Sequence, residues 1–407
     1  MSPAPTAIYL DHQATTPVDP RVLDAMLPWF SETFGNAHSE QHAWGRQAAE
    51  AVDVAREQVA ALIGASAREI VFTSGATESN NLAIKGAFFA ANGRPKGHVV
   101  ISAIEHPCVR ETAAWLERQG VSVTTVPVTR QGQVRPDSVA KALRPETFLV
   151  AVMHANNETG VVQPIEEIAS LTRDAGILFH VDGVQAAGKL AVDVEALGCD
   201  SYSVSGHKFG ALKGVGGLYL RDPSSLEWIQ QGGHQEGGYR AGTENVPGIV
   251  AMGKAAEAAL RDLEANTAHC RAVRDVFDRL AANMPMTRLN GHPEARLPNT
   301  TNLCCLYADA MSICMALSIE GVFLGTGSAC ASHTQEPSYV LRAMGLSDQA
   351  AYCSVRISVG PSVSLDDAEF AAERITQAVE TIRLVTAPED IGTCGDDCPC
   401  FIETDTP

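Results

Sequence analysis

A lysine between an apolar segment and a glycine-rich segment is the first candidate for chemistry. Ser205-Gly206-His207-Lys208 follows the β-like run 200–204 and precedes the glycine-rich run 210–217. An amine held at such a place loses part of its hydration, which lowers its pKa and suits it to form a Schiff base with an aldehyde cofactor. Most lysines are exposed, so the motif alone also fits a solvated surface turn. The neighbouring segments must decide.

Two further reactive side chains lie late in the chain. Gly325-Thr326-Gly327-Ser328-Ala329-Cys330-Ala331-Ser332 is a segment of small residues that presents one cysteine. Residues 352–358 are typical of a strand that contains Arg356. An inward arginine requires a carboxylate that accepts a pair of its N–H groups. The sequence leaves open whether that carboxylate comes from a substrate or from an internal partner.

A small and hydroxylated segment connects a predicted strand to a predicted helix. The run 70–73 reads as a buried strand, and Ser74-Gly75-Ala76-Thr77-Glu78-Ser79-Asn80-Asn81 leads into a helix over 82–91. Backbone N–H groups at a helix start bind anions, and the Thr77 hydroxyl adds a donor. The segment therefore predicts a phosphate site that is not a Walker loop. An ordinary helix cap is the alternative.

Asp182 ends the apolar run 177–181 and precedes Gly183-Val184-Gln185. A carboxylate at that depth is costly unless a cation or several donors meet it. A pyridinium nitrogen is such a cation, and pairing with a carboxylate makes its ring a better electron sink. A helix N-cap is the alternative interpretation of Asp182.

The elements that position these residues form an alternating pattern. Apolar runs at 98–102, 121–128, 147–154 and 177–181 are separated by helical segments. This order predicts a parallel sheet covered by helices on both faces, in which ligands bind beyond the carboxyl ends of the strands. The candidates that follow strand ends are Thr77, His106, Asn157, Asp182 and Ser205–Lys208.

The composition is that of an ordinary globular protein. Of 407 residues, 45% are apolar and 19% charged, and the net charge of −18 argues against direct nucleic-acid binding. We expect no secretory signal and no bilayer-spanning run. Eleven scattered cysteines do not suggest a disulfide framework, so we expect a reducing cytoplasm.

The expected organisation has three parts. We expect a large domain over 15–260, and a small domain made of 1–14 with 261–390 that carries the Cys330 loop. The third part is a cysteine-rich acidic tail over 391–407.

The ordered set of motifs resembles the cysteine desulfurases of the NifS/IscS type. The matching segments, in the family's order, are Tyr9-Leu10-Asp11, Ala14-Thr15-Thr16-Pro17, Phe72 to Ser79, Glu105-His106, Asn156-Asn157-Glu158, Val181-Asp182 with Gln185, Ser205 to Lys208, Arg240 with Gly242-Thr243, and Gly327 to Cys330 with Glu336 to Leu341. The resemblance implies the type I fold of pyridoxal-phosphate transferases. That fold has a large domain with a mainly parallel seven-stranded sheet between helices, and a smaller α+β domain.

The resemblance also implies how pyridoxal 5′-phosphate (PLP) is held. Lys208 would carry the cofactor and shuttle protons, and His106 would stack on its ring and serve in acid–base steps. Asp182 would pair with the pyridinium nitrogen and Gln185 with the phenolic oxygen. The phosphate ligands would be Ala76, Thr77, Ser205 and His207, with Thr243 contributed by the second subunit of a homodimer.

The implied reaction removes sulfur from L-cysteine. Asn157 and Arg356 would hold the substrate carboxylate. The Cys330 thiolate would attack the substrate sulfur, leaving alanine and a persulfide on Cys330, so this thiol should titrate below an ordinary cysteine. Glycines around Cys330 would let the loop swing outward to an acceptor, such as an iron–sulfur scaffold or a tRNA-thiolation enzyme. Cys330 is also a candidate transient ligand of an iron–sulfur cluster.

The chain departs from the family at two places. The tail Cys394-Gly395-Asp396-Asp397-Cys398-Pro399-Cys400 replaces the family's usual ending. Cys394, Cys398 and Cys400 are candidate zinc or iron ligands or a sulfur relay, and a disordered tail is the alternative. Leu212 stands where the family commonly has proline, a change from which we expect little effect.

Three functions therefore remain. The first is a cysteine desulfurase. The second is another PLP enzyme, such as a selenocysteine lyase or an aminotransferase, although an aminotransferase has no use for Cys330. The third is a metal-binding partner protein that acts through its tail.

Overall fold

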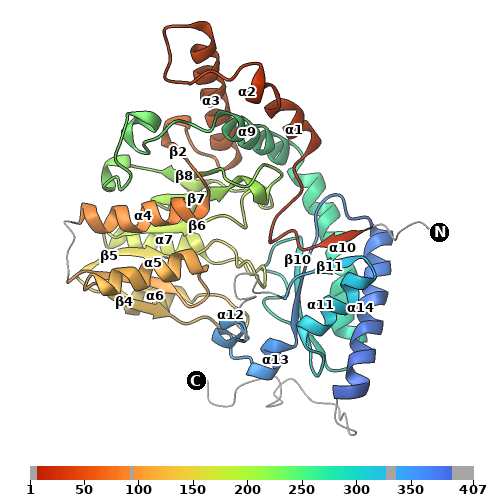
Figure 1. Ribbon diagram of the computed structural model, residues 1–407. Coiled ribbons are helices and arrows are strands. Elements are labelled where there is room, and N and C mark those ends of the chain that lie inside the picture. The colour runs from red at the N-terminus through yellow and green to blue at the C-terminus, as the bar shows by residue number, and fades with distance from the viewer. Residues whose placement is uncertain (1–6, 92–95, 327–335, 387–407) are drawn as a thin grey trace.

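The computed structural model describes residues 7–91, 96–326 and 336–386, which form two packed units (Figure 1). The larger unit is a seven-stranded sheet with helices on both sides. The smaller unit contains the first strand and the elements after residue 262. None of the helices in these ranges is long and apolar enough to cross a membrane.

The large sheet has the order β2-β8-β7-β6-β5-β3-β4. β8 alone runs antiparallel to its neighbours, and the other strands are parallel to one another. The predicted mainly parallel seven-stranded sheet is therefore confirmed. Its strands are β2 (Ile70–Thr73), β3 (His98–Ser102), β4 (Ser122–Val126), β5 (Thr147–Ala151), β6 (Leu178–Asp182), β7 (Ser201–Ser205) and β8 (Gly216–Leu220).

Alternation along the central strands builds an apolar core on each face of this sheet. In β5, Leu149 and Ala151 join one buried cluster, whereas Val150 joins the other. Successive strand residues point to opposite faces, so a continuous apolar run serves both cores. One face is covered by α4 (Ala76–Ala90) and α5 (Pro107–Arg118). The elements packed on the opposite face are α3 (Ala43–Leu62), α6 (Pro136–Ala142), α7 (Ile165–Asp174), α8 (Val194–Leu197) and α9 (Val246–Arg261).

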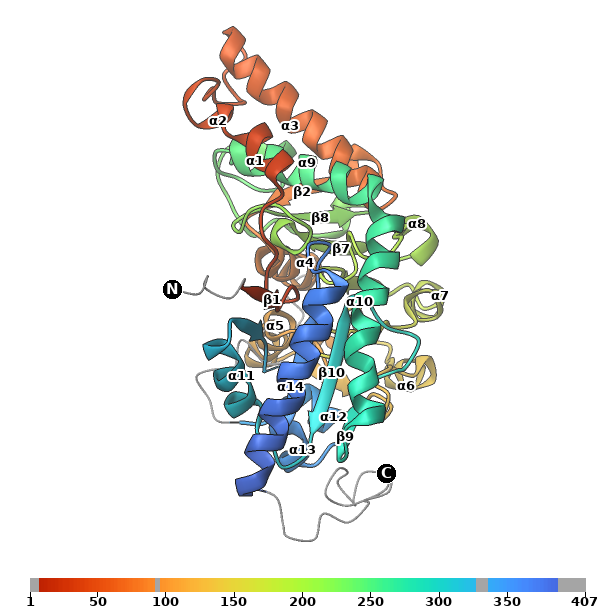
Figure 2. The same cartoon turned by 90° about the vertical axis from the view of Figure 1, so that its right-hand side faces the viewer.

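The smaller unit has its own apolar cluster, between a three-stranded antiparallel sheet and two long helices (Figure 2). The sheet is formed by β9 (Thr287–Leu289), β10 (Thr300–Cys305) and β12 (Ser354–Ser358). The helices α10 (Leu263–Asn283) and α14 (Leu365–Thr386) lie side by side against it. The remaining elements here are α11 (Ala310–Ile319), α12 (Tyr339–Ala343) and α13 (Asp348–Tyr352).

The first strand, β1 (Ile8–Leu10), belongs to the smaller unit, where it pairs in parallel with β11 (Val322–Leu324). Ile8 and Leu10 are buried in that unit's cluster. The chain then crosses to the large sheet and forms α1 (Pro20–Met26) and α2 (Pro28–Ser31). Residues 11–19 therefore lie between the units, where candidate site residues from both units meet.

Two helix boundaries differ from the sequence-based expectation. The helix expected over 82–91 begins at Ala76, so Ala76 and Thr77 form its first turn rather than a preceding loop. The sequence also predicts two long helices, roughly over 246–266 and 268–282, but the helices of the structure meet at Asp262, which ends α9 and precedes α10. Periodicity alone did not locate this break because apolar residues continue on both sides of it.

Candidate active site

Most of the predicted site residues line one cavity of about 480 Å³ at the carboxyl ends of the parallel strands. Those that line it are Ala76, Thr77, His106, Asn157, Asp182, Gln185, Ser205, His207 and Lys208. Arg356 lines an adjoining cavity of about 130 Å³ together with His106, Asn157, Gln185 and Lys208. Thr243 is exposed and lines neither cavity. Cys330, Cys394, Cys398 and Cys400 lie outside the described residues.

One end of the larger cavity is built for an anion. α4 starts directly after Gly75, and Ala76, Thr77, Ser205 and His207 border the cavity there. The positive end of the helix dipole and the unpaired N–H groups of its first turn attract negative charge. Glu78 lies in the same turn, but it accepts from the Ser74 N–H at 2.7 Å and pairs with Arg240 at 2.8 Å, which offsets its charge.

The backbone approaches itself closely beside this turn. A Cβ atom added to Gly216 of β8 would lie 2.6 Å from the Gly75 Cα and 2.8 Å from the Val204 carbonyl oxygen. Gly75 itself has φ = 150°, a backbone conformation that favours glycine. Gly216 of β8 and Gly75, the residue before α4, therefore set the position of the α4 start.

Asp182, at the end of β6, is buried and is oriented by its neighbours. Its Oδ2 accepts from the Asn80 Nδ2 at 2.8 Å, and its Oδ1 accepts from the Val184 N–H at 3.2 Å. The Asn80 Oδ1 lies 2.8 Å from the His180 Nε2, and the His180 Nδ1 lies 2.8 Å from the Ser201 hydroxyl. Because a carboxylate only accepts, Asn80 must present its amino end to Asp182.

His180 is neutral in this arrangement. Complete burial lowers the pKa of His180 to about 3, so its Nε2 carries the hydrogen that the Asn80 oxygen accepts. Sequence reasoning missed both Asn80 and His180. The spacing His180-Val181-Asp182 was a usable signal, because residues two apart on a strand share a face.

Lys208 is held by the segment that connects the two units. Its Nζ donates to the Gln13 carbonyl at 2.6 Å and to the Ala14 carbonyl at 2.8 Å. Thr16 ties the same turn down, because its N–H donates to the His207 carbonyl at 3.0 Å. The surface-turn alternative is therefore wrong, because the Lys208 amine is bonded to these two carbonyls and Lys208 lines both cavities.

His106 caps α5 and presents a defined tautomer. Its Nδ1 accepts from the Cys108 N–H at 3.2 Å, so the neutral ring carries its hydrogen on Nε2. Burial lowers the pKa of His106, and the Lys208 charge adds to this effect while the Asp182 charge opposes it. The ring is thus neutral near pH 7.

The sequence predicts that Cys108 is a small buried core residue, and the structure differs from this prediction. It is partly exposed and lines the cavity, with its Sγ 3.0 Å from the His106 Nδ1. Burial of the thiol raises the pKa of Cys108 well above its usual value, so it stays protonated. The spacing of Cys108 two residues after His106 did not reveal this contact.

Arg356 is almost fully buried and has an internal carboxylate partner. Its Nη2 pairs with the Asp11 Oδ1 at 2.5 Å, and its Nη1 donates to the Asn157 carbonyl at 2.9 Å. The Asn157 Oδ1 is buried without a hydrogen-bond partner among the described residues. A buried guanidinium beside an unsatisfied amide oxygen makes a polar pocket suited to a small amino acid.

The chain belongs to the class-V aminotransferase family, whose description matches residues 8–370. A relative named cysteine desulfurase IscS from Anaeromyxobacter dehalogenans (strain 2CP-C) is 47% identical over 381 residues, 92% of this chain and 93% of the relative. These findings confirm the resemblance inferred from the ordered motifs.

Solved structures agree in fold. A structure titled NIFS-LIKE PROTEIN has a TM-score of 0.86 and 34% identity, and covers 92% of this chain and 100% of its own. Another, titled SspA in complex with cysteine, has a TM-score of 0.78 and 38% identity over 88% of this chain and 99% of its own. The type I fold expected from the sequence is thereby confirmed.

Proposed function

We propose that this protein is a PLP-dependent cysteine desulfurase. It would convert L-cysteine to L-alanine and hold the sulfur as a persulfide on Cys330. The observation that carries the proposal is the cavity that brings Lys208, His106, Asp182 and the start of α4 together beside Arg356. The similarity to proteins named cysteine desulfurase selects this reaction among those of the family.

The residues present fit PLP. The start of α4 offers N–H groups to a phosphate, and the buried Asp182 carboxylate, held by Asn80, is suited to a ring cation. The Lys208 amine and the neutral His106 ring stand between these ends. When bound, PLP would supply an electron sink for negative charge at the substrate's α-carbon.

The chain's own side chains would bind the substrate and carry protons to and from it. The Arg356 guanidinium and the Asn157 amide would hold the cysteine carboxylate, with Asp11 keeping the guanidinium in place. The Lys208 amine would carry protons to and from the α-carbon. The Nε2–H of His106 is the second proton carrier in the cavity.

Both described ends of the Cys330 segment are anchored at the site. Gly325 exchanges backbone hydrogen bonds with Arg356 at 3.1 and 2.8 Å. After the segment, the Ser338 hydroxyl donates to the buried Glu158 at 2.5 Å, and Tyr339 lines the smaller cavity. Residues 327–335 must join these two points, which supports Cys330 as the thiolate that takes the substrate sulfur.

The sulfur transfer balances without an oxidant. The Cys330 thiolate forms a bond to the substrate sulfur while the carbon–sulfur bond breaks, and its electron pair stays with the carbon. That carbon then takes a proton and becomes the alanine methyl group. The persulfide must be discharged to an acceptor, for which we propose an iron–sulfur scaffold or a tRNA-thiolation enzyme.

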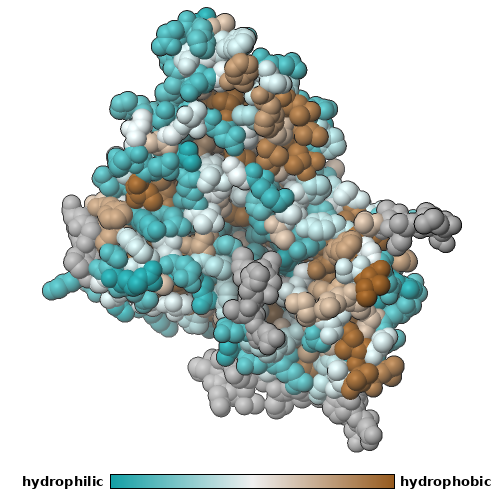
Figure 3. Space-filling view, in the orientation of Figure 1, coloured by the Kyte–Doolittle hydropathy of each residue, from teal (hydrophilic) through white to brown (hydrophobic). Residues whose placement is uncertain are grey.

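We also propose that the protein works as a homodimer in a reducing cytoplasm. Figure 3 shows exposed apolar surface over α1 and α9. Leu23 of α1, Leu27 and Phe30 of α2 are exposed large apolar side chains. Such a patch suits a second copy, to whose phosphate site the exposed Thr243 would contribute. The seven described cysteines, from Cys108 to Cys353, are all free thiols, as a reducing compartment requires.

The separate apolar clusters of the two units support the division of the chain that the sequence suggested. We propose a large domain over 15–260, and a small domain made of 1–14 with 261–390. In the described ranges, no group of three or more His, Cys, Asp or Glu side chains could hold a metal ion. Metal binding by Cys394, Cys398 and Cys400 remains a proposal about the tail.

Two measurements test the proposed function. Borohydride reduction of the purified protein followed by mass spectrometry should find a PLP adduct on Lys208. A Cys330→Ser chain should retain that adduct but release no alanine from L-cysteine. An adduct on another residue, or unimpaired alanine release by Cys330→Ser, would refute the proposal.

A further inference from the structure

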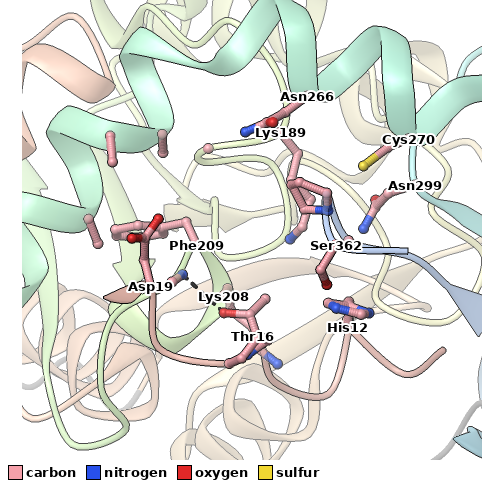
Figure 4. Close-up of a pocket in the computed structure, with 18 of the residues that line it drawn as sticks. His12, Thr16, Asp19, Lys189, Lys208, Phe209, Asn266, Cys270, Asn299 and Ser362 are labelled. Atoms are coloured by element: carbon pink, nitrogen blue, oxygen red, sulfur yellow. Dashed lines mark hydrogen bonds between the residues drawn. The ribbon is translucent and has the colours of Figure 1, made fainter. Parts of the chain in front are cut away.

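Lys189 is an enclosed amine that the proposed reaction does not use. It follows Asp182 by seven positions, and Gly188 before it has φ = 75°. It lines another cavity, of about 420 Å³, which Figure 4 shows with Lys208, His12 and Cys270 around it. We call it the second cavity, to distinguish it from the active site with its two adjoining cavities. Among the described residues, no carboxylate pairs with Lys189.

The amine is directed instead at Gln185. The Lys189 Nζ donates to the Gln185 backbone carbonyl at 3.1 Å and to its side-chain Oε1 at 3.2 Å. Gln185 lines the two cavities of the candidate active site, whereas Lys189 lines neither of them. Gln185 is therefore part of the wall between the active site and the second cavity, and Lys189 contacts it from behind.

These contacts fix which end of the Gln185 amide faces which way. The Gln185 Nε2 donates to the Gln13 carbonyl at 3.2 Å, and a carbonyl oxygen only accepts. The other end of the amide, its Oε1, therefore faces Lys189, whose amine donates to it at 3.2 Å. The Nε2 has two hydrogens, and Gln13 uses one of them. The second is available to a ligand in the active-site cavity.

The surroundings of Lys189 disfavour its positive charge, so the amine contributes mainly through its hydrogen bonds. Burial lowers the pKa of Lys189 to about 7, and the Lys208 charge adds to this effect. The nearby Cys270 thiol is neutral, because burial raises the pKa of Cys270 to about 11. The part of the Lys189 side chain that stays accessible faces the second cavity.

We propose that Lys189 is a positioning residue that locks the Gln185 amide with its amino end toward the active-site cavity, where that end donates to the phenolic oxygen of PLP. The inference rests on the proposed function, because PLP is the ligand it invokes. Lys189 touches neither PLP nor substrate. It acts through Gln185, and this can be tested separately.

The test is a double-mutant cycle on the full-length chain, with PLP affinity as the measurement. Lys189→Met should weaken PLP binding about tenfold, the factor that corresponds to 1.4 kcal/mol. In a Gln185→Ala background the same substitution should change PLP affinity by less than about twofold, because the group that Lys189 orients is gone. Lys141→Met, at an exposed lysine of α6, is the matched control and should leave the affinity unchanged.

A spectroscopic measurement distinguishes a Lys189 that orients the Gln185 amide from a Lys189 that only fills space. In Lys189→Met, the apparent pKa of the bound cofactor's absorbance band should rise. A phenolic oxygen that loses a hydrogen-bond donor binds a proton more tightly. Lys189→Gln keeps a donor and should fall between the wild type and Lys189→Met. It carries the test if the methionine variant fails to fold.

Each result decides the matter. Equal losses of affinity in the wild-type and Gln185→Ala backgrounds, or an unchanged absorbance pKa, would overturn the inference and leave the proposed function intact. A wild-type chain that takes up no PLP would overturn both.

Discussion

At the scale of single residues, the site depends on groups whose hydrogen-bonding roles are unambiguous. The Asp182 carboxylate only accepts, so it defines the orientation of Asn80, which in turn defines the tautomer of His180. The Gln13 carbonyl likewise assigns one end of the Gln185 amide. Each assignment follows from what the neighbour can and cannot donate.

Asn80 is the first of these residues that mutation can test. Asn80→Asp places a second carboxylate 2.8 Å from Asp182, and two such groups cannot both stay ionised. Alanine release should fall at least about tenfold, which corresponds to 1.4 kcal/mol of lost transition-state stabilisation. Steady-state kinetics measure this, with the exposed Asn283→Asp as control. Unchanged turnover in Asn80→Asp would show that Asn80 does not support Asp182.

Arg356 should act mainly on substrate binding. Arg356→Lys keeps the charge but loses the planar pair of donors, so KM for L-cysteine should rise about tenfold with a smaller change in kcat. Arg342→Lys, at an exposed ion pair with Asp348, should change neither constant. An Arg356→Lys enzyme with normal KM would remove Arg356 from the substrate site.

Residue identities and order were enough to predict that Lys208, His106, Asp182 and Gln185 lie near one another, because each follows a strand of a sheet whose carboxyl ends converge. Asn80 and Lys189 could not be found this way. Asn80 lies about a hundred positions from the carboxylate it orients, and its role depends on which end of an amide faces that group. No sequence pattern records the orientation of an amide.

At the scale of elements, the start of α4 is positioned by a contact between glycines. Gly216→Ala should push the Gly75 backbone away, because the added Cβ would lie 2.6 Å from its Cα. PLP should bind about tenfold more weakly, because the N–H groups at the α4 start that would hold its phosphate are displaced. Equilibrium titration with PLP measures the loss.

The neighbouring glycine provides the control. In Gly217→Ala the nearest atom to the new Cβ is a Val204 side-chain carbon at 3.3 Å, which can yield. Its PLP affinity should stay close to that of the wild type. Equal PLP affinities for the Gly216 and Gly217 variants would show that the contact between Gly216 and Gly75 does not position the phosphate site.

Element boundaries were harder to predict than element types. The alternating apolar runs predicted the parallel strands, because such strands bury both faces. The early start of α4 at Ala76 was missed because the small polar residues 74–81 look like a loop, and only Gly75 and its packing against β8 begin the helix there.

At the scale of the whole molecule, buried neutral histidines should make stability depend on pH. Burial lowers the pKa of His154 to about 4 and that of His180 to about 3, both below the ordinary value near 6.5. Between pH 6.5 and 4 the unfolded chain binds protons that the folded chain does not. The free energy of unfolding should therefore fall on acidification, by up to about 1.4 kcal/mol per pH unit for each histidine.

Urea unfolding at pH 7 and pH 5 measures this slope. His154→Gln removes one titrating group and should flatten it, whereas His234→Gln, at an exposed histidine, should leave it unchanged. An equally steep slope in His154→Gln would show that His154 does not remain neutral in the folded protein.

The hydrogen bonds that hold the Lys208 amine also have a consequence for how the protein is made. The Gln13 carbonyl that holds the Lys208 amine is itself fixed from the far end of the chain, because the Gln13 N–H donates to the Ser358 hydroxyl at 2.9 Å. During synthesis on a ribosome, residue 13 emerges long before residue 358. The nascent chain therefore cannot complete its lysine pocket until β12 has left the exit tunnel, so cofactor capture must wait for the emergence of residue 358.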